Sequence, residues 1–323
     1  MSLWRERLIG VMLLCLVVLL TLAAASHLVS SQSGEYIATQ VRILDSLRPH
    51  LLLLVLLNCC ALALLRERRI ALAGLIGAGL VLVSIVADYR ARSSPALASQ
   101  SDVTLLWFNM LQENQIAPDV LATALLDSGA DVIAIGESRN AAALPDLLTD
   151  QYPYSLRCSP KTLETCGILL LSRLPFDGAR QRDLPSGRKR FTRLRLSVPD
   201  REPLNLIFMH MVKPWYLGMA AAEREALDAA LGGPKDLPLV LMGDFNAAPW
   251  SRRMRQVEQK HGLRHAPFPV ATWPVEAGPF GLPIDHVLVR GRAELVSVDP
   301  WGAHLGSNHR GLKAKLALQR TMP

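Results

Sequence analysis

An apolar strand that ends in polar groups is found in the stretch Leu239-Val240-Leu241-Met242-Gly243-Asp244-Phe245-Asn246. Asp244 and Asn246 are two residues apart, and residues at this spacing on a strand face the same side. If both face one substrate, Asp244 could accept a proton from an attacking water while Asn246 donates hydrogen bonds to a phosphoryl oxygen. Gly, Asp and Asn are also favoured where a strand meets a turn, for conformational reasons alone. The stretch by itself therefore leaves a catalytic and a structural interpretation open.

Short apolar runs alternate with helical segments on both sides of this strand, from Val103 onward. This alternation predicts a layered domain of strands and helices. A chain length of about 220 residues is enough for two packed sheets around one core. We expect strands at 103–108, 131–135, 167–171, 191–198, 204–209, 237–242 and 284–289, and helices at 118–128 and 220–231.

Short motifs with polar residues follow the strands in a fixed order: Trp107-Phe108-Asn109, Ile133-Ala134-Ile135-Gly136-Glu137, Gly167-Ile168-Leu169-Leu170-Leu171-Ser172-Arg173, His210-Met211-Val212-Lys213-Pro214, Gly243-Asp244-Phe245-Asn246, Ile284-Asp285-His286 and Ser307-Asn308-His309. This ordered series, from Val103 to Leu316, resembles the endonuclease/exonuclease/phosphatase superfamily. That superfamily includes deoxyribonuclease I, exonuclease III, apurinic endonucleases, neutral sphingomyelinases and inositol polyphosphate 5-phosphatases. The resemblance implies an α/β fold, a four-layer sandwich in which two packed mixed sheets are flanked by helices.

The resemblance also implies that the strand ends form one cleft. His309 stands where the family has the histidine that contacts the scissile phosphate, and Asp285 stands where it has the carboxylate that orients this histidine. His210 would donate a second hydrogen bond to the phosphate or protonate the leaving group. The implied reaction is in-line attack by water without a covalent enzyme intermediate, and the implied catalytic residues are His210, Asp244, Asn246, Asp285 and His309.

A metal site is expected beside these residues. Glu137 ends a buried strand, where an ionised carboxylate is costly unless a cation pairs with it. Mg²⁺ or Mn²⁺, bound by one or two carboxylates and by substrate oxygens, would satisfy this carboxylate and neutralise charge on the phosphate and the leaving oxygen. The metal ligands implied by the resemblance are Glu137, Asn109 and Asn308.

Two positions depart from the family pattern. Asn308 stands where the family usually has Asp before the closing His, so one anionic metal ligand is lost. Leu111 stands where some nuclease members carry an acidic residue. A catalytically weakened or inactive membrane-bound binding protein of the same fold is therefore the alternative to an active phosphoesterase.

Three apolar stretches predict a membrane anchor over residues 1–90. They cover about 8–25, 47–65 and 70–87, each about long enough to cross a bilayer core. A cleaved signal peptide is the alternative reading of the first stretch, because Arg5 and Arg7 precede it and small residues follow it. The two later stretches favour retention of the first as a membrane helix.

The distribution of arginines predicts which side of the membrane each part faces. Arg5, Arg7 and the turn Arg66-Glu67-Arg68-Arg69 favour the cytoplasm. Three crossings from an inside start leave residues 91–101, a polar linker, and residues 102–318, the catalytic domain, on the periplasmic or extracellular side of the cell membrane. In that oxidising compartment Cys158 and Cys166 could form a disulfide; the alternatives are two unrelated free thiols or two ligands of a metal site that lacks its other members.

The charge is compatible with anionic partners. The chain of 323 residues has a formal net charge of +7 and a mean hydropathy of +0.22, which is natural when an apolar anchor precedes a globular domain. Nucleic acid and lipid headgroups both fit this charge as phosphoester substrates, and the oligomeric state is left open. A basic run, Arg188, Lys189, Arg190, Arg193 and Arg195, would place alternate residues on one strand face, either as a solvated edge or as a track for phosphates.

Overall fold

A computed structural model describes residues 3–28, 35–95, 100–157, 167–185, 187–216 and 218–319. It divides into two compact units. One comprises Met1–Ala91 together with Ala247–Arg255, and the other comprises Arg92–Asn246 together with Gln256–Pro323. The two units are described separately, as the membrane unit and the catalytic unit.

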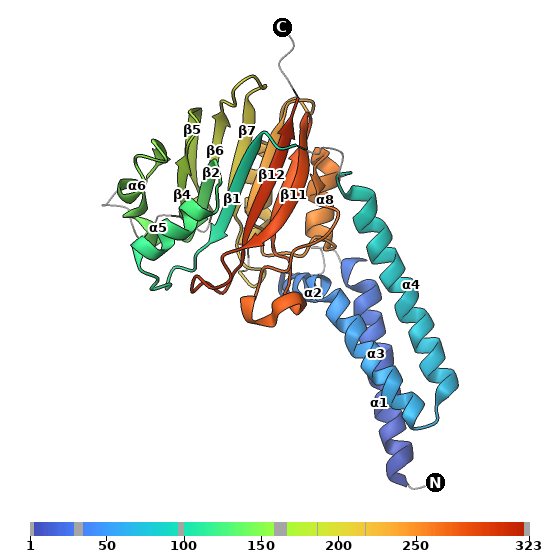
Figure 1. Cartoon of the computed structure of the whole chain (residues 1–323). Coiled ribbons are helices and arrows are strands. Elements are labelled where there is room, and N and C mark those ends of the chain that lie inside the picture. The colour runs from blue at the N-terminus through green and yellow to red at the C-terminus, as the bar shows by residue number, and fades with distance from the viewer. Residues whose placement is uncertain are drawn as a thin grey trace. The chain divides into compact units, whose positions relative to one another are not determined.

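The catalytic unit contains two six-stranded mixed sheets (Figure 1). The first sheet has the order β11 (Ala293–Trp301), β12 (Gly311–Leu318), β1 (Val103–Asn109), β2 (Val132–Gly136), β4 (Ile168–Ser172) and β3 (Tyr154–Leu156). The second has the order β5 (Phe176–Leu184), β6 (Gly187–Leu196), β7 (Leu204–His210), β8 (Leu239–Asp244), β10 (Asp285–Arg290) and β9 (Arg264–His265). Helices α5 (Pro118–Asp127), α6 (Leu144–Leu147), α7 (Met219–Ala230) and the part of α8 (Arg252–His261) from Gln256 onward complete the fold. The predicted sandwich of two mixed sheets flanked by helices is confirmed.

Strand β1 shows why the sequence folds into layers. Leu105 and Trp107 belong to the core cluster between the two sheets, whereas Leu106 and Phe108 belong to the cluster under α5 and α6. Both faces of the strand are therefore buried, and a strand buried on both faces reads as a continuous apolar run rather than an alternating one. β5, β11, β12 and helix α8 were not anticipated from the sequence.

Strand pairing in the second sheet brings the polar strand ends into line. β7 runs parallel to β8 with His210 opposite Asp244, and β10 runs antiparallel to β8 with Asp285 opposite Asp244. β7 and β8 approach each other so closely at Gly243 that a Cβ there would lie 1.8 Å from the carbonyl oxygen of Met209. Only glycine fits at this position, so Gly243 sets the spacing of the strands that carry His210 and Asp244.

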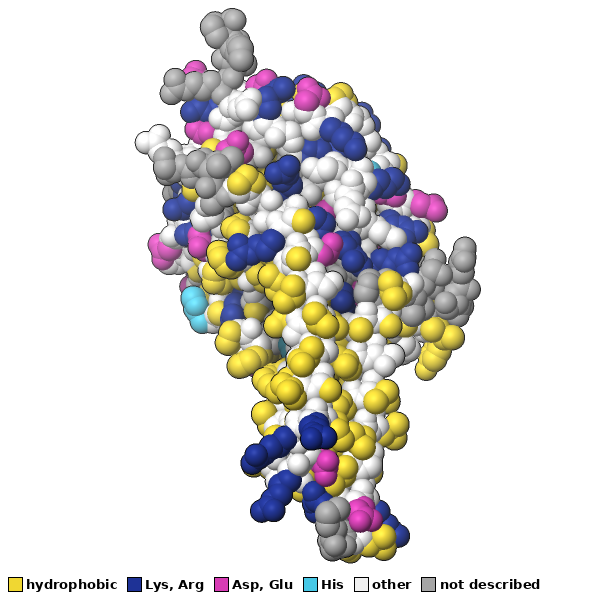
Figure 2. All heavy atoms as spheres, turned by 90° about the vertical axis from the view of Figure 1, so that its right-hand side faces the viewer, with side chains coloured by type: hydrophobic (Ala, Val, Ile, Leu, Met, Phe, Trp, Pro, Cys, Tyr) yellow, Lys and Arg dark blue, Asp and Glu magenta, His cyan; other side chains and the backbone are white. Residues whose placement is uncertain are grey.

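The membrane unit contains α1 (Leu3–Ala25), α2 (Glu35–Ser46), α3 (Arg48–Leu64) and α4 (Arg68–Arg92). α1 and α4 have 23 and 25 residues and are apolar enough to cross a membrane, and a third span results if α2 and α3, which meet at a bend of 68°, form one span. Helices of this length extend about 35 Å, compared with about 30 Å for a bilayer core. Figure 2 shows hydrophobic side chains along these helices and basic side chains gathered at one end of them.

Hydrogen bonds inside the membrane unit bring segments that are distant in the sequence together. Arg5 donates to the carbonyl oxygen of Leu65 at 2.6 Å and to Glu67 at 3.2 Å, so the start of α1 and the turn between α3 and α4 lie at the same end. The indole of Trp250 donates to the carbonyl oxygen of Ser46 at 2.9 Å, which holds the short segment Ala247–Arg255 on this unit. The sequence did not indicate this attachment. α4 also extends to Arg92, into the predicted linker, while Cys158 and Cys166 fall outside the described residues.

Candidate active site

Strand ends from both sheets place the candidate side chains together. Asn109 ends β1 and Glu137 follows β2 in the first sheet, whereas His210, Asp244 and Asp285 lie at the paired ends of β7, β8 and β10. All of these except Glu137, which is partly exposed, are buried, and so is His309. Residues far apart in the chain therefore share one enclosed polar site.

Asp244 lies at the centre of this site. Its Oδ2 accepts a hydrogen bond from Nδ2 of Asn109 at 3.1 Å and lies 3.5 Å from Nε2 of His210 and 3.9 Å from Nε2 of His309. Its Oδ1 accepts the backbone N–H of Asn246 at 2.8 Å. Burial and the nearby charge of Asp285 raise the pKa of Asp244 to about 7, so this carboxyl can take up and release a proton near neutral pH.

His309 and Asp285 form a buried pair. Nδ1 of His309 lies 2.8 Å from Oδ2 of Asp285, whose Oδ1 accepts the indole N–H of Trp107 at 2.7 Å. Burial alone would lower the pKa of His309, but the charge and hydrogen bond of Asp285 outweigh it and raise this pKa to about 9. The imidazole is therefore a cation at neutral pH, with Nε2 directed toward Asp244.

His210 differs from His309 in its charge. Its Nε2 lies 3.8 Å from Oε1 of Glu137, but complete burial lowers its pKa to about 4 despite that carboxylate. Burial opposes ionisation of Glu137 as well, yet its electrostatic coupling to the His210 ring and the N–H of Gln112, 2.9 Å from Oε2, hold the pKa of Glu137 below its ordinary value. The site thus contains one neutral and one charged imidazole at pH 7, a division suited to one hydrogen-bond donor and one cation.

Two of the candidate residues have strained backbones. Glu137 has φ of 52° and Asn246 has φ of 49°, in the left-handed region that non-glycine residues rarely adopt. Nδ2 of Asn246 donates to the carbonyl oxygen of Met211 at 2.8 Å, which fixes its amide beside the end of β7. Strain of this kind persists only where the surroundings determine it, and it concentrates at functional sites.

The donor set can hold a divalent cation. Asp244, Asp285 and His309 offer ligand atoms that all lie within 4.8 Å of one another, and Glu137 adds a further carboxylate beside Asp244 and His210. The Oδ1 atom of Asn308 is buried without a hydrogen-bond partner among the described residues. Crowded carboxylates and an unsatisfied amide oxygen are the groups that a hard cation binds. The amide oxygen of Asn109, unlike that of Asn308, is already bonded, because it accepts the N–H of Leu111 at 3.3 Å. The Nδ2 atom of Asn109 faces the carboxylates.

Two residues that support the site belong to motifs found in the sequence but were given no role there. Trp107 holds Asp285, and the hydroxyl of Ser307 joins the carbonyl oxygen of Asn109, at 2.6 Å, to the N–H of His309, at 3.0 Å. Trp107 is two residues before Asn109 on a strand, so both side chains face the same side, and this spacing could have indicated that Trp107 lies at the site. Ser307 gave no such signal, because its contact with Asn109 joins residues 198 positions apart.

Comparison with known proteins places this geometry in context. A family model described as the endonuclease/exonuclease/phosphatase family matches residues 106–309. No curated protein sequence matches the chain.

Solved structures with the same fold include an endonuclease/exonuclease/phosphatase from Beutenbergia cavernae DSM 12333, with 17% identity, coverage of 68% of this chain and 72% of that one, and a TM-score of 0.52. A family protein from Leptotrichia buccalis C-1013-b has 14% identity, coverage of 67% and 100%, and a TM-score of 0.50. D. rerio TDP2, solved with a single-strand DNA product, has 11% identity, coverage of 67% and 98%, and a TM-score of 0.51. At these identities the likeness concerns the fold.

Proposed function

Because the chain belongs to the endonuclease/exonuclease/phosphatase family, whose members are metal-dependent phosphoester hydrolases, we propose that it is a membrane-anchored phosphodiesterase active outside the cytoplasm. One observation carries the proposal. Asp244, which titrates near neutral pH, lies within 4 Å of both a neutral and a charged imidazole. Hydrolysis of a phosphodiester needs a proton acceptor, a hydrogen-bond donor and a positive charge at one place, and this site supplies all three.

Each catalytic residue receives a role from its surroundings. Asp244 accepts the proton of the water that attacks phosphorus in line with the leaving oxygen. The amide of Asn246 orients that water and the phosphoryl group. His309, charged and held by Asp285, donates a hydrogen bond to a phosphoryl oxygen, and His210 donates another from its neutral ring.

Mg²⁺ or Mn²⁺ is the proposed cofactor, held by Glu137 and Asn308. Asn109 positions the carboxylates of Glu137 and Asp244 through its hydrogen bonds to them. When bound, the cation supplies positive charge to the phosphate and the leaving oxygen. The neutral oxygen of Asn308 offers weaker attraction than a carboxylate would. This is the observation that keeps a second candidate function, a weakened or inactive membrane-bound binding protein, in consideration.

The proposed location follows from the anchor. Residues 1–90 form the membrane anchor, residues 91–101 the linker and residues 102–318 the catalytic domain. Arg5 and the arginine-rich turn lie at one end of the membrane unit, and basic residues at helix ends favour the cytoplasmic side. An odd number of crossings then puts the catalytic domain on the periplasmic or extracellular side, where nucleic acid and phospholipid-type esters are the proposed substrates.

The test is hydrolysis by the full chain in detergent with Mg²⁺ or Mn²⁺. Plasmid DNA, a phospholipid panel and bis-p-nitrophenyl phosphate are the substrates, and Asp244→Ala is compared with Asp150→Ala, a change at an exposed carboxylate outside the site. We expect turnover that requires a divalent metal and falls by about 10³-fold or more only in Asp244→Ala. Equal turnover in both variants would exclude the proposed site. Metal binding without turnover of any substrate would instead support the binding-protein alternative.

A further inference from the structure

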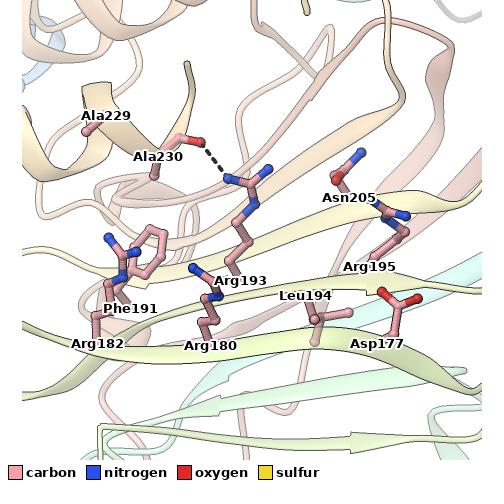
Figure 3. Close-up of a pocket in the computed structure, with 11 residues that line it drawn as sticks. Asp177, Arg180, Arg182, Phe191, Arg193, Leu194, Arg195, Asn205, Ala229 and Ala230 are labelled. Atoms are coloured by element: carbon pink, nitrogen blue, oxygen red, sulfur yellow. Dashed lines mark hydrogen bonds between the residues drawn. The ribbon is translucent and has the colours of Figure 1, made fainter. Parts of the chain in front are cut away.

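A second polar cavity lies on the outer face of the second sheet, between strands β5 and β6 and the end of helix α7. It has a volume of about 390 Å³, within the range of ligand pockets. Leu194 points from β6 into the core between the sheets, so its neighbours Arg193 and Arg195 face the other way. Figure 3 shows Arg180, Arg182, Arg193 and Arg195 on this same outer side of the strands. We call this cavity the arginine groove.

The arginine groove carries an excess of positive charge. Arg180 pairs directly with Arg193 across the strands, and like charges in directly opposite positions destabilise a sheet. Asp177, opposite Arg195, is the one acidic residue among the described residues that line the groove. Four arginines and one aspartate leave a formal charge of +3.

These arginines have few protein partners. Arg193 donates to the carbonyl oxygen of Ala230, at a long 3.5 Å, and within the described part of the chain no hydrogen bond or ion pair is found for the side chains of Arg180, Arg182 and Arg195. Arg190 on the same strand contrasts with them, since it is buried against Glu223. The exposed guanidinium groups of the groove are thus available to a ligand.

The spacing of the arginines favours an anion with several oxygens. Opposite residues have Cβ atoms about 5 Å apart, and alternate residues on one strand are about 6.7 Å apart. The pair Arg180 and Arg193 can therefore grip one tetrahedral group, while Arg182 and Arg195 flank it on either side. A phosphate monoester carries about −1.5 to −2 charge and three strong acceptor oxygens, and guanidinium groups bind phosphate with paired hydrogen bonds.

The lining disfavours a nucleic acid strand. Proteins that bind single strands combine a basic groove with aromatic side chains on which bases stack. Phe191 is the aromatic residue of the lining, and only 4% of its surface is exposed. The groove provides charge without a stacking platform.

We propose that the arginine groove is a binding site for a small molecule or lipid headgroup that carries two or more phosphate groups, separate from the Asp244 site. The two sites lie on different faces of the second sheet's strands, since Arg193 faces outward while the Asp285 carboxylate is bonded to Trp107 of the first sheet. The inference does not depend on catalysis.

The test measures pyrophosphate binding by isothermal titration to the full chain in detergent, with EDTA present and ionic strength held constant. Arg180→Gln/Arg193→Gln is compared with Arg224→Gln/Arg264→Gln, which removes the same charge from exposed positions outside the groove. We expect pyrophosphate to bind about tenfold or more tightly than inorganic phosphate, and the groove variant alone to lose about tenfold in affinity. Arg180→Lys/Arg193→Lys, which keeps the charge but not the paired hydrogen bonds, should be intermediate.

A further experiment identifies the source of the ligand. Vesicles of phosphatidylcholine containing phosphatidylinositol phosphate are added as competitor. Competition that disappears in the groove variant indicates a lipid headgroup, and its absence indicates a soluble ligand.

Three results would overturn the inference. The first is equal pyrophosphate affinity in the wild type and the groove variant. The second is citrate binding as tight as pyrophosphate binding. The third is a groove variant that loses binding of a single-stranded oligonucleotide but keeps binding of pyrophosphate. Retained unfolding temperature and retained hydrolysis of bis-p-nitrophenyl phosphate show that the variants are folded.

Discussion

Glu223→Gln tests whether a buried ion pair holds the strand that carries His210. Glu223 on α7 is fully buried and pairs with Arg190, whose guanidinium also donates to the carbonyl oxygen of His210. The other carboxylate oxygen of Glu223 accepts the N–H of Val212 at 2.7 Å. One carboxylate thus connects β6, the end of β7 and α7.

The variant leaves the Arg190 charge buried without its counter-ion. Removing one partner of a buried pair costs about 3–5 kcal/mol, because the remaining charge is desolvated and uncompensated. For a unit of this size, that loss lowers the unfolding temperature by about 6–20 °C, at roughly 2–4 °C per kcal/mol. kcat should fall as well, because Arg190, which donates to the carbonyl oxygen of His210, is no longer held in place by Glu223. KM should change less.

The assay is near-ultraviolet circular dichroism of the full chain in detergent during heating. Glu225→Gln, an exposed glutamate on the same helix, is the matched control and should shift stability by less than about 0.5 kcal/mol. Arg190→Met/Glu223→Leu should recover part of the stability, because no buried charge remains. A loss below about 1 kcal/mol in Glu223→Gln, or no recovery in the double variant, would refute the reasoning.

Three further predictions concern the candidate active site. Asp285→Asn should lower the pKa of His309 from about 9, because burial is then opposed only by the weaker interactions with Asp244 and Glu137. Titration of histidine resonances by NMR in EDTA checks this, and a pKa still near 9 contradicts it. In wild type, the charged His309 stabilises the fold by about 3 kcal/mol below pH 6.5, at 1.36 kcal/mol per pKa unit, and this contribution is lost as the pH rises through 9, a loss that the variant should not show. Asp244→Asn should abolish turnover yet make the metal-free protein more stable above pH 7. The reason is that ionisation of a carboxyl whose folded pKa is raised from 3.8 to about 7 costs the fold about 4 kcal/mol. The measurement is the unfolding temperature in EDTA from about pH 4 to 8, and parallel curves for wild type and variant would contradict the prediction. Asn308→Asp should tighten Mg²⁺ binding by about tenfold through an added anionic ligand, and unchanged affinity by isothermal titration would remove this position from the metal site.

The sequence predicted the sandwich because its strands are locally recognisable. The runs around Val103, Val132 and Leu239 are apolar and bounded by turn residues, and they form β1, β2 and β8. Their polar ends also gather as expected, since the amide of Asn109 donates hydrogen bonds to both Glu137 and Asp244. The roles of these residues stay predictions.

Prediction failed where burial depends on a neighbour distant in the chain. Arg190 belongs to a basic run that reads as one surface, but α7 covers it and Glu223 neutralises it. Arg193, three residues later on the same strand, is exposed. Strand alternation places the two arginines on opposite faces of β6, and only the tertiary structure shows that α7 covers the one at Arg190.

The sequence by itself determined many of the strands, the apolar helices that are long enough to cross a membrane, and the polar groups that stand at strand ends. These are local properties, because residue size, polarity and spacing set the preference of each short segment. Tertiary structure alone decided that His210, Asp244 and Asp285 stand in register, that Asp285 keeps His309 protonated, and that four arginines share one groove. Such relations depend on which strands pair and which faces are covered, and those contacts join residues far apart in the chain.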